Sequence, residues 1–371
     1  MKLATARAFP LRLGFTRPLV TALGEFTTRE SVVLEVCDAD GGCGHGEAAP
    51  WRGFGGETLA AAQSALERAI RLLEKRGAGA QEWPLELVTL LAETPAAHAA
   101  VEGALCDLAA RLTGQPLAAF LRQAAGLPDA AAPAAVAVNA LLVEREPEAL
   151  RAEAARARAA GYRAAKLKVA TGPLVEDIAR VRAARDGLGP QVALRLDANG
   201  AWSEAQAREG LDALAAFRPD YVEQPVAAAD LAAMARLRAS GGLRIAADES
   251  LAARGGLAQV LGAGACDVVV LKPSLLGGPL AALAAARRAR EAGCTVVFTH
   301  AFESAVGRLH ALHCAAAWDD PQAVHGLSGG TPFRDDLAAL PAVEEGRLPV
   351  PDGPGLGLVL ETARLQAGED A

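Results

Sequence analysis

VALRLDANG, residues 192–200, is the stretch that decides the fold. Its apolar run has the length of a buried strand and stops at Asp197, where Ala-Asn-Gly begins a turn. Two other strand-like runs likewise stop at an acidic residue, at Glu223 in DYVEQP and at Asp248 in LRIAADES. Spacings of 26 and 25 residues separate the three acids, which is the length of one strand–loop–helix–loop unit in a β/α barrel.

The three acids predict a metal site. The carboxyl ends of parallel barrel strands meet at one rim, so Asp197, Glu223 and Asp248 are expected to converge. Three negative charges at one point repel each other unless a cation lies between them. Each acid taken singly is explained as a loop cap, but the regular spacing favours a ring. Such a ring suits a hard, oxygen-ligated cation, with Mg²⁺ preferred and Mn²⁺ as a substitute.

Lysines flank the acids on both sides. Lys166 and Lys168 alternate within AAKLKV and so share one strand face, and Lys272 follows four apolar residues in DVVVLKP. A lysine directed into a barrel is costly unless an anionic group meets it, although a polar rim is an alternative for the first pair. A lysine beside a metal and another cation can act as a base at neutral pH. The pattern predicts proton removal next to a metal-bound substrate carboxylate. The other polar residues expected at this rim are Asn199, Glu249, Thr299 and His300.

The composition excludes several classes of protein. With 371 residues, 51% of them hydrophobic, the chain can form one barrel with an attached smaller domain. A net charge of −7 and the lack of a basic run argue against nucleic-acid binding. The sequence shows no signal-peptide pattern and no uncharged apolar run of about 20 residues, so we expect a cytoplasmic protein without a membrane span. The six cysteines lack paired metal-type spacing and are expected to be free thiols.

Residues 1–128 predict an α+β unit. Alternating apolar and polar residues at 2–13 and 31–38 indicate antiparallel strands. The segments 17–29 and 41–56 contain Gly and Thr and are expected to be loops, either plain surface turns or mobile flaps over a site. Helices are expected at 57–76, 84–93 and 95–113.

Residues 129–320 predict a barrel, since strand-like and helical stretches alternate at near-constant spacing. Strands are expected at 135–142, 163–169, 192–197, 220–223, 243–248, 266–272 and 294–299. The helices between them are expected at 147–160, 174–187, 203–216, 228–239, 254–262, 277–292 and 304–317. A doubly wound sheet would need a Gly-rich turn after its first strand, and 143–147 offers none. Residues 321–371 are expected to complete the barrel and to return to the N-terminal unit.

As a set, five motifs resemble those of the muconate-lactonizing subgroup of the enolase superfamily, and the resemblance covers essentially the whole chain. They are K-x-K at 166–168, D-x-N at 197–199, EQP at 223–225, DES at 248–250 and LKP at 271–273. The resemblance implies an α/β fold, a modified (β/α)₇β TIM-type barrel with an N-terminal α+β capping domain that carries two specificity loops. It also implies one Mg²⁺ held by the three acids, with Lys168 and Lys272 on opposite sides of the substrate.

Within the subgroup, the segments 300–318 and 325–337 are similar to those of the o-succinylbenzoate synthases. This similarity implies that Glu303 and Ser304 support or contact the substrate. Thr299-His300 departs from the pattern, since those enzymes commonly have two serines there. In the mandelate-racemase subgroup a His at this place is a base paired with an Asp on the sixth strand. Lys272 stands at that place here, so His300 is expected to contact substrate or to lie at the rim.

The resemblance therefore implies α-proton abstraction followed by syn loss of water, giving o-succinylbenzoate for menaquinone or phylloquinone synthesis. Lys168 would be base and then acid, Lys272 would stabilise the enediolate, and Lys166 would tune Lys168. The first alternative is N-succinylamino-acid racemisation, with Lys168 and Lys272 as opposed bases, and the next is muconate-type cycloisomerisation. Dipeptide epimerases usually carry Asp-x-Asp after the eighth strand, which 323–329 lacks.

A metal-binding barrel without activity is a further alternative, which the retention of both lysines disfavours. The expected partner is a small-molecule carboxylate, with no nucleic acid and no membrane. A homo-oligomer is left open.

Overall fold

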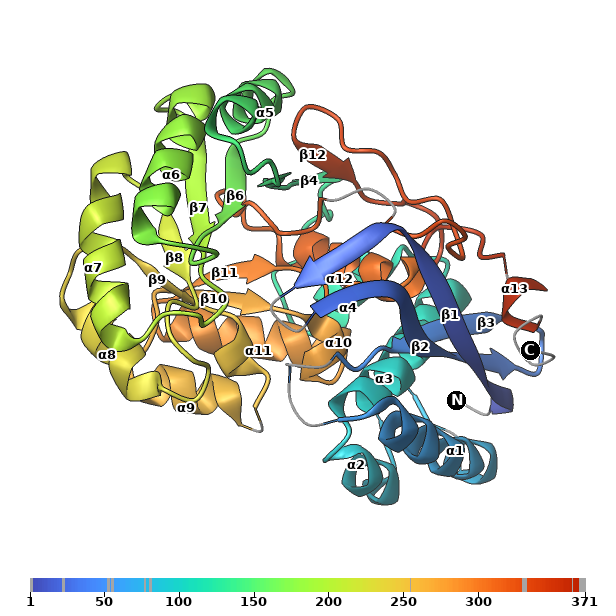
Figure 1. Cartoon of the computed structure of the whole chain (residues 1–371). Coiled ribbons are helices and arrows are strands. Elements are labelled where there is room, and N and C mark those ends of the chain that lie inside the picture. Colours follow the sequence, from blue (N-terminus) through green and yellow to red (C-terminus); the bar gives the residue numbers. More distant parts are fainter. Residues whose placement is uncertain are drawn as a thin grey trace.

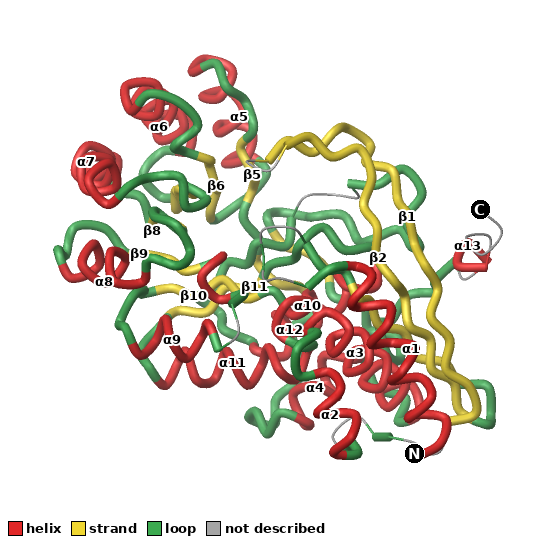
Figure 2. The backbone as a smooth tube through the Cα atoms, turned by 60° about the horizontal axis from the view of Figure 1, so that its bottom comes forward, coloured by secondary structure: helices red, strands yellow, loops and turns green. Residues whose placement is uncertain are grey.

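The chain folds into a parallel barrel with an antiparallel sheet and a group of helices packed against it (Figures 1 and 2). The computed structural model describes residues 3–21, 24–51, 54, 57–76, 78–79, 82–253, 255–328, 332–361 and 363–366. Within those ranges no helix combines the length and the apolar character needed to cross a lipid bilayer.

The N-terminal part, called the cap from here on, is a three-stranded antiparallel sheet covered by helices. It comprises β1 (Leu3–Thr21), β2 (Gly24–Asp38), β3 (Cys43–Ala48), α1 (Leu59–Arg76), α2 (Leu85–Leu91), α3 (Pro95–Leu112) and α4 (Leu117–Ala124). Fully buried leucines such as Leu34, Leu66 and Leu105 form a core of its own between sheet and helices. The three predicted helices are found, whereas α4 was not predicted.

The prediction of a loop at 17–29 was wrong. Apart from residues 22–23, which lie outside the described ranges, the segment continues the β1–β2 hairpin, and Leu19 pairs with Phe26. Thr, Val and Phe favour extended backbone, so the hairpin continues past the irregular pairing between Gly14 and Leu19.

The prediction of a loop at 41–56 was also wrong in part, because 43–48 forms β3. Its glycines serve close packing, since β3 lies directly on α3. A Cβ at Gly46 would come within 1.9 Å of the Ala100 carbonyl oxygen, and one at Gly44 within 2.3 Å of the Ala104 carbonyl oxygen. These glycines therefore report contact between a helix and a strand. Residues 52, 53, 55 and 56 of the segment lie outside the described ranges.

The expectation of free thiols was wrong for one pair of cysteines. Cys37 and Cys43 form a disulfide across the β2–β3 hairpin, where they are direct register partners. Their separation of six residues matches no familiar motif, so only the hairpin register brings them together. The other four cysteines, Cys106, Cys266, Cys294 and Cys314, are buried free thiols as expected.

The barrel is a parallel sheet that closes through an eighth segment. Its strands in chain order are β5 (Ala140–Leu142), β6 (Ala164–Lys168), β7 (Ala193–Asp197), β8 (Tyr221–Glu223), β9 (Ile245–Ala247), β10 (Val268–Leu271) and β11 (Thr295–Phe298). Single bridges join Thr299 to Gly326 and Val138 to His325, so residues 325–326 lie between β11 and the start of the barrel. The predicted TIM-type barrel with its antiparallel-sheet cap is confirmed.

Helices cover the outside of this barrel in the predicted order (Figure 1). They are α5 (Pro147–Ala159), α6 (Leu174–Leu188), α7 (Glu204–Leu214), α8 (Leu231–Ala239), α9 (Gly256–Gly262), α11 (Pro279–Glu291) and α12 (Ala305–Trp318). A further short helix, α10 (Pro273–Leu276), was not predicted. The predicted first strand, 135–142, is divided: β4 (Ala135–Ala137) leaves the barrel sheet and pairs antiparallel with β12 (Arg347–Pro349).

The segment after the barrel makes contacts with the cap. Phe15 bridges to Phe333, and the Leu117 amide donates to the Gly355 carbonyl oxygen at 2.7 Å. A short helix, α13 (Ala363–Gln366), follows and contacts β1. Residues that follow the barrel in the sequence therefore pack against the cap, which precedes it.

Candidate active site

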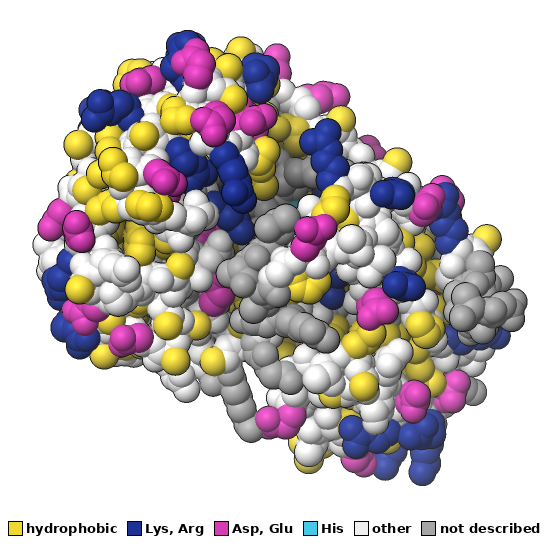
Figure 3. All heavy atoms as spheres, viewed as in Figure 1, with side chains coloured by type: hydrophobic (Ala, Val, Ile, Leu, Met, Phe, Trp, Pro, Cys, Tyr) yellow, Lys and Arg dark blue, Asp and Glu magenta, His cyan; other side chains and the backbone are white. Residues whose placement is uncertain are grey.

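A cavity of about 370 Å³ lies where the carboxyl ends of the barrel strands face the cap. The barrel contributes most of the polar lining, and the cap contributes Trp51 and Phe54. In Figure 3, basic side chains gather near the hollow between barrel and cap, beside residues that are not described. Ten of the predicted site residues line this cavity: Lys166, Lys168, Asp197, Asn199, Glu223, Asp248, Glu249, Lys272, Thr299 and His300.

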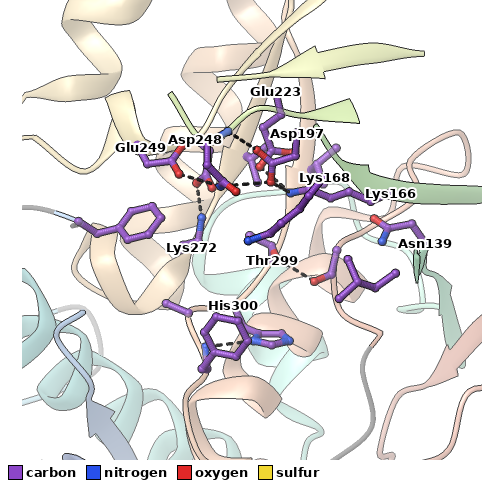
Figure 4. Close-up of a pocket in the computed structure, with 18 of the residues that line it drawn as sticks. Asn139, Lys166, Lys168, Asp197, Glu223, Asp248, Glu249, Lys272, Thr299 and His300 are labelled. Atoms are coloured by element: carbon purple, nitrogen blue, oxygen red, sulfur yellow. Dashed lines mark hydrogen bonds and ion pairs between the residues drawn. The ribbon is translucent and has the colours of Figure 1, made fainter. Parts of the chain in front are cut away.

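Strand register brings the acids and lysines together. Lys168 of β6 pairs with Asp197 of β7, which pairs with Glu223 of β8. Lys166, on the same face of β6, places its Nζ 2.7 Å from Asp197 Oδ2 and 2.7 Å from Glu223 Oε1. Lys272 reaches in at the end of β10 and pairs with Asp248 (Figure 4). Two ammonium groups thus meet three carboxylates at one end of the barrel.

Burial makes this charge cluster strongly coupled. Glu223 is 1% exposed; burial together with the charges of Asp197 and Asp248 raises its pKa to about 8, against the opposing effect of Lys166. Burial also acts to raise the pKa of Asp197, but Lys166 outweighs it and the pKa falls below its ordinary value. For Lys166, burial acts to lower the pKa, and the surrounding carboxylates overcome it and raise the pKa. The raised pKa of Glu223 indicates that the buried acids favour additional positive charge.

The donor set fits a hard divalent cation. Asp197, Glu223 and Asp248 offer only carboxylate oxygens, which Mg²⁺ prefers. Lys166 stands between two of these acids and Lys272 binds the third, so ammonium groups supply the cationic charge in this arrangement. The three acids do not have their ligand atoms all within 4.8 Å of one another. Among the described residues, Glu35, Cys37 and Cys43 alone satisfy that distance, and their two sulfurs are joined in the disulfide.

Neighbouring polar groups orient the acids. Asn199, in a left-handed conformation with φ 44°, donates its amide N–H to Asp197 Oδ1 at 2.9 Å and its side-chain Nδ2 to Glu249 Oε1 at 3.1 Å. Burial, together with the charges of Asp248 and Asp197, raises the pKa of Glu249 to about 7. Asn199 therefore links the end of β7 to the end of β9.

Gln224, which sequence analysis missed, also orients one of the acids, because its side chain binds the backbone at Asp248. Its side-chain oxygen accepts the amide N–H groups of Asp248 and Ser250, each at 3.2 Å, and its Nε2 donates to the Ser250 hydroxyl at 2.8 Å. It is fully buried. A glutamine between Glu223 and a proline is the sequence signal that could have identified it.

The wall across the cavity carries no carboxylate among its described lining residues. Thr299 donates its hydroxyl to the Gly326 carbonyl oxygen at 2.7 Å, and His300 Nδ1 accepts the Phe302 amide at 3.3 Å. Burial, with the charges of Arg308 and Lys272, lowers the pKa of His300 to about 3. The imidazole is therefore neutral at neutral pH, and Figure 4 shows it apart from the acids.

The structure places Glu303 and Ser304 behind the described cavity wall. Glu303 accepts the Ala301 amide at 2.7 Å and the Ser274 hydroxyl. Ser304 donates its hydroxyl to Glu47 Oε2 of β3 at 2.6 Å and caps α12. Neither residue is among the described residues that line the cavity.

Asn139 is a second lining residue that sequence analysis missed. It follows β4, and its side-chain oxygen accepts Arg195 Nη1 at 3.3 Å while its Nδ2 donates to the Ala140 carbonyl oxygen at 3.1 Å. Arg195 also donates to the Val324 carbonyl oxygen at 2.7 Å, which ties the closing segment to β7. A lone asparagine within an apolar strand, VAVNALL, was the available signal.

Comparisons with known proteins agree with this geometry. Residues 149–364 match the family model "Enolase C-terminal domain-like", and residues 6–121 match "Mandelate racemase / muconate lactonizing enzyme, N-terminal domain". An o-succinylbenzoate synthase of Geobacillus kaustophilus is 30% identical, covering 96% of this chain and 93% of that protein. An L-Ala-D/L-Glu epimerase of Bacillus subtilis (strain 168) is also 30% identical, covering 85% and 86%. An o-succinylbenzoate synthase of Thermobifida fusca (strain YX) is 45% identical over 41% of this chain and 47%, about half, of that protein.

Solved structures superimpose over nearly the whole chain. The N-succinyl Arg/Lys racemase from Bacillus cereus ATCC 14579 gives a TM-score of 0.84 at 26% identity, covering 99% of this chain and 98% of that one. A dipeptide epimerase from Cytophaga hutchinsonii, complexed with Mg and D-Ala-L-Val, gives the same TM-score, identity and coverage. The family models and the full-length relatives confirm the predicted resemblance. The chain therefore belongs to the mandelate racemase/muconate lactonizing enzyme family of the enolase superfamily.

Proposed function

We propose that the chain is a Mg²⁺-dependent o-succinylbenzoate synthase that acts in the cytoplasm, in menaquinone or phylloquinone synthesis. The observation that carries the proposal is the asymmetry of the cavity. All four of its described acids lie at the ends of β7 to β9, with lysines beside them, and the opposite wall is neutral. The o-succinylbenzoate synthases among the relatives support the same activity.

Asp197, Glu223 and Asp248 would hold the metal. When bound, Mg²⁺ neutralises the carboxylate of the substrate and so acidifies the adjacent α-proton. Lys168 Nζ removes that proton and returns it to the hydroxyl that leaves from the same face as water. Lys272 supplies a fixed positive charge for the negative charge that develops on the substrate. Lys166, bound to two of the acids, keeps a third positive charge near Lys168.

The neutral wall argues against dipeptide epimerisation. A dipeptide carries an ammonium group away from its reacting carboxylate, and that group needs an acidic partner. The described residues there, which include Thr299, His300, Gly326 and Ser328, provide none. Burying an ammonium group without an acidic partner is unfavourable. A cyclohexadiene carboxylate or an N-succinyl amino acid has no such ammonium group.

Racemisation of N-succinyl amino acids is the second candidate. Lys168 and Lys272 both line the cavity and come from β6 and from the end of β10, with three strands between them. Two lysines reaching the substrate from different sides provide the two bases that inversion needs. The similarity to an N-succinyl Arg/Lys racemase supports this candidate.

One pair of assays tests the proposal. The protein with Mg²⁺ is given 2-succinyl-6-hydroxy-2,4-cyclohexadiene-1-carboxylate, and dehydration is followed with and without excess chelator. Deuterium incorporation from D₂O into each enantiomer of an N-succinyl amino acid is measured in parallel. We expect chelator-sensitive dehydration. Fast exchange of both enantiomers without dehydration would reject the synthase and favour the racemase, while full dehydration in excess chelator would contradict the metal site.

A further inference from the structure

Arg29, in β2 of the cap, lies behind the cavity and binds both sides of its wall. Its Nη1 donates to the Pro50 carbonyl oxygen at 2.9 Å and its Nη2 to the Ala49 carbonyl oxygen at 2.6 Å. Its Nε donates to the Phe302 carbonyl oxygen at 3.1 Å, and its Nη2 lies 3.5 Å from the Ala301 carbonyl oxygen. One guanidinium group therefore joins the segment after β3 to the segment after β11.

Both segments expose a side chain to the cavity next to the atoms that Arg29 holds. Trp51 follows Pro50 and lines the cavity, and the Arg29 guanidinium carbon lies 4.8 Å from the centre of its ring. Phe302 lines the cavity from the barrel side, and the two rings are 5.6 Å apart. Arg29 itself does not line the described cavity, so any effect it has on substrate acts through these rings.

The backbone at Phe302 needs such a restraint. Its φ of 58° is left-handed, a conformation that is unfavourable for a residue with a bulky side chain. That conformation directs the Phe302 carbonyl toward Arg29 and its amide toward His300 Nδ1. Fixing this one residue therefore sets the position of His300 as well as of the Phe302 ring.

Two buried carboxylates partly offset the cost of burying the Arg29 charge. Arg29 is 5% exposed, and burial lowers its pKa, while the charges of Glu303 and Glu47 act in the opposite direction. Glu303 accepts the Ala301 amide, while Arg29 faces the Ala301 carbonyl oxygen. The 301–302 segment is thus held on both its amide and its carbonyl sides.

We propose that Arg29 is a positioning residue that fixes Trp51 and the His300–Phe302 segment as the substrate-binding wall, coupling the cap to the barrel at the active site. The proposal rests on the cavity being the active site of the proposed function, but not on which of the two reactions takes place there. Because the wall lies apart from the proposed metal ligands, Arg29 acts on substrate binding and leaves proton transfer to the lysines.

The first test is amide hydrogen exchange on the ligand-free protein, which needs no assumption about the reaction. Arg29→Met keeps the length and apolar stem of the side chain and removes its hydrogen bonds. We expect faster exchange in peptides covering 47–51 and 299–304, with the β1–β2 pairing at 5–12 unchanged. Arg29→Lys keeps the charge without the planar group and should give an intermediate effect.

Arg122→Met is the matched control. Arg122 is 6% exposed and likewise donates to two backbone carbonyl oxygens, those of Ala317 and Pro128, at 2.8 Å each. It does not line the described cavity. Its loss should lower thermal stability without changing exchange in either wall segment.

The second test is kinetic, on whichever substrate the wild type converts. In Arg29→Met we expect KM to rise roughly tenfold while kcat changes less than about threefold, and Arg122→Met should keep the wild-type KM. A merely structural role would reduce the active fraction, and so kcat, at unchanged KM. Unchanged exchange in both wall segments, or an unchanged KM in folded Arg29→Met and Arg29→Lys, overturns the proposal. A wild type that converts neither substrate rejects the proposed function, and the exchange result then still decides the role of Arg29.

Discussion

Lys272 separates the two candidate reactions at the level of one residue. It is 8% exposed, pairs with Asp248 and lines the cavity. Lys272→Arg keeps a positive charge, but a guanidinium stays protonated and is a poor base. A synthase that uses Lys272 as a cation should keep measurable dehydration, with losses from altered geometry. A racemase should stop inverting while Lys168 still exchanges the proton of one enantiomer. Unimpaired racemisation in this variant would contradict the assignment of Lys272 as the second base.

Glu223 tests the proposed metal ligands. Glu223→Gln replaces a charged oxygen ligand by a neutral amide at a fully buried position. We expect the Mg²⁺ dissociation constant, measured by isothermal titration calorimetry, to rise by about 100-fold or more, since weaker perturbations around metal sites already cost about 10–100-fold. Glu204→Gln is the control. Glu204 of α7 forms an ion pair with Arg236 of α8 on the outside of the barrel, and it does not line the described cavity. Equal affinity in the Glu223 variant and in the wild type would remove Glu223 from the metal site.

At the scale of elements, the connection from β6 to α6 sets the position of Lys168. Asp177 of α6 accepts the Ala170 amide at 2.7 Å, and Arg180 donates to the Lys168 carbonyl oxygen at 3.0 Å. Ala170 has a φ of 61°, so its backbone conformation needs these contacts. Asp177→Ala should lower the free energy of unfolding by about 1–3 kcal/mol. It should also reduce kcat by about tenfold, because small displacements of a base are costly.

The control for this prediction is Asp230→Ala, which removes the N-terminal cap of α8 at a place away from the cavity. Both variants should lose stability in thermal unfolding, but only the Asp177 variant should lose turnover per folded molecule. An unchanged kcat in folded Asp177→Ala would show that the connection does not position Lys168.

The barrel elements were predictable because the strands from β6 to β10 are mainly apolar runs that end at a charged residue or directly before one. The end of β7 at Asp197 and the end of β8 at Glu223 are visible without any knowledge of contacts. The cap was less predictable, because Gly44 and Gly46 look like loop residues until α3 is placed against β3. In the site, the residues at strand ends could be named from the sequence, Asn199 among them, whereas supports that act through distant contacts, such as Gln224 and Arg29, could not.

At the scale of the whole molecule, His45 links stability to pH. Burial acts to lower its pKa, but the charges of Asp107 and Glu35, together with the hydrogen bond between the imidazole and Glu35, outweigh burial and raise it. The charged form is therefore favoured in the folded state. Its contribution to stability is fully present below the unfolded pKa of about 6.5 and is lost as pH rises through the raised folded pKa. We expect the difference in Tm between wild type and His45→Gln to shrink as pH rises from about 6.5 through the raised pKa of the folded state. A difference independent of pH would contradict this assignment.

Hydrogen bonds between residues far apart in the sequence were the least predictable features. Glu47 meets Ser304, and Asp107 Oδ1 accepts the Leu356 amide at 2.8 Å. Each of these acids reads as an ordinary surface residue in the sequence. Their partners lie more than 200 residues away, and no local pattern specifies such pairs.

Contacts between the cap and the C-terminal segment also decide when the cap can be fixed in place during protein synthesis. The cap sheet leaves the ribosome before the barrel does, but Phe15 meets Phe333 and Leu117 meets Gly355. A nascent chain that has not reached residue 355 holds every proposed metal ligand and both lysines, yet its cap is not fastened. Translation must pass the whole barrel before the wall that Arg29 organises is secured. A stop codon directly after residue 331 removes both Phe333 and Gly355. The resulting chain should keep the barrel strands and fail to turn over substrate.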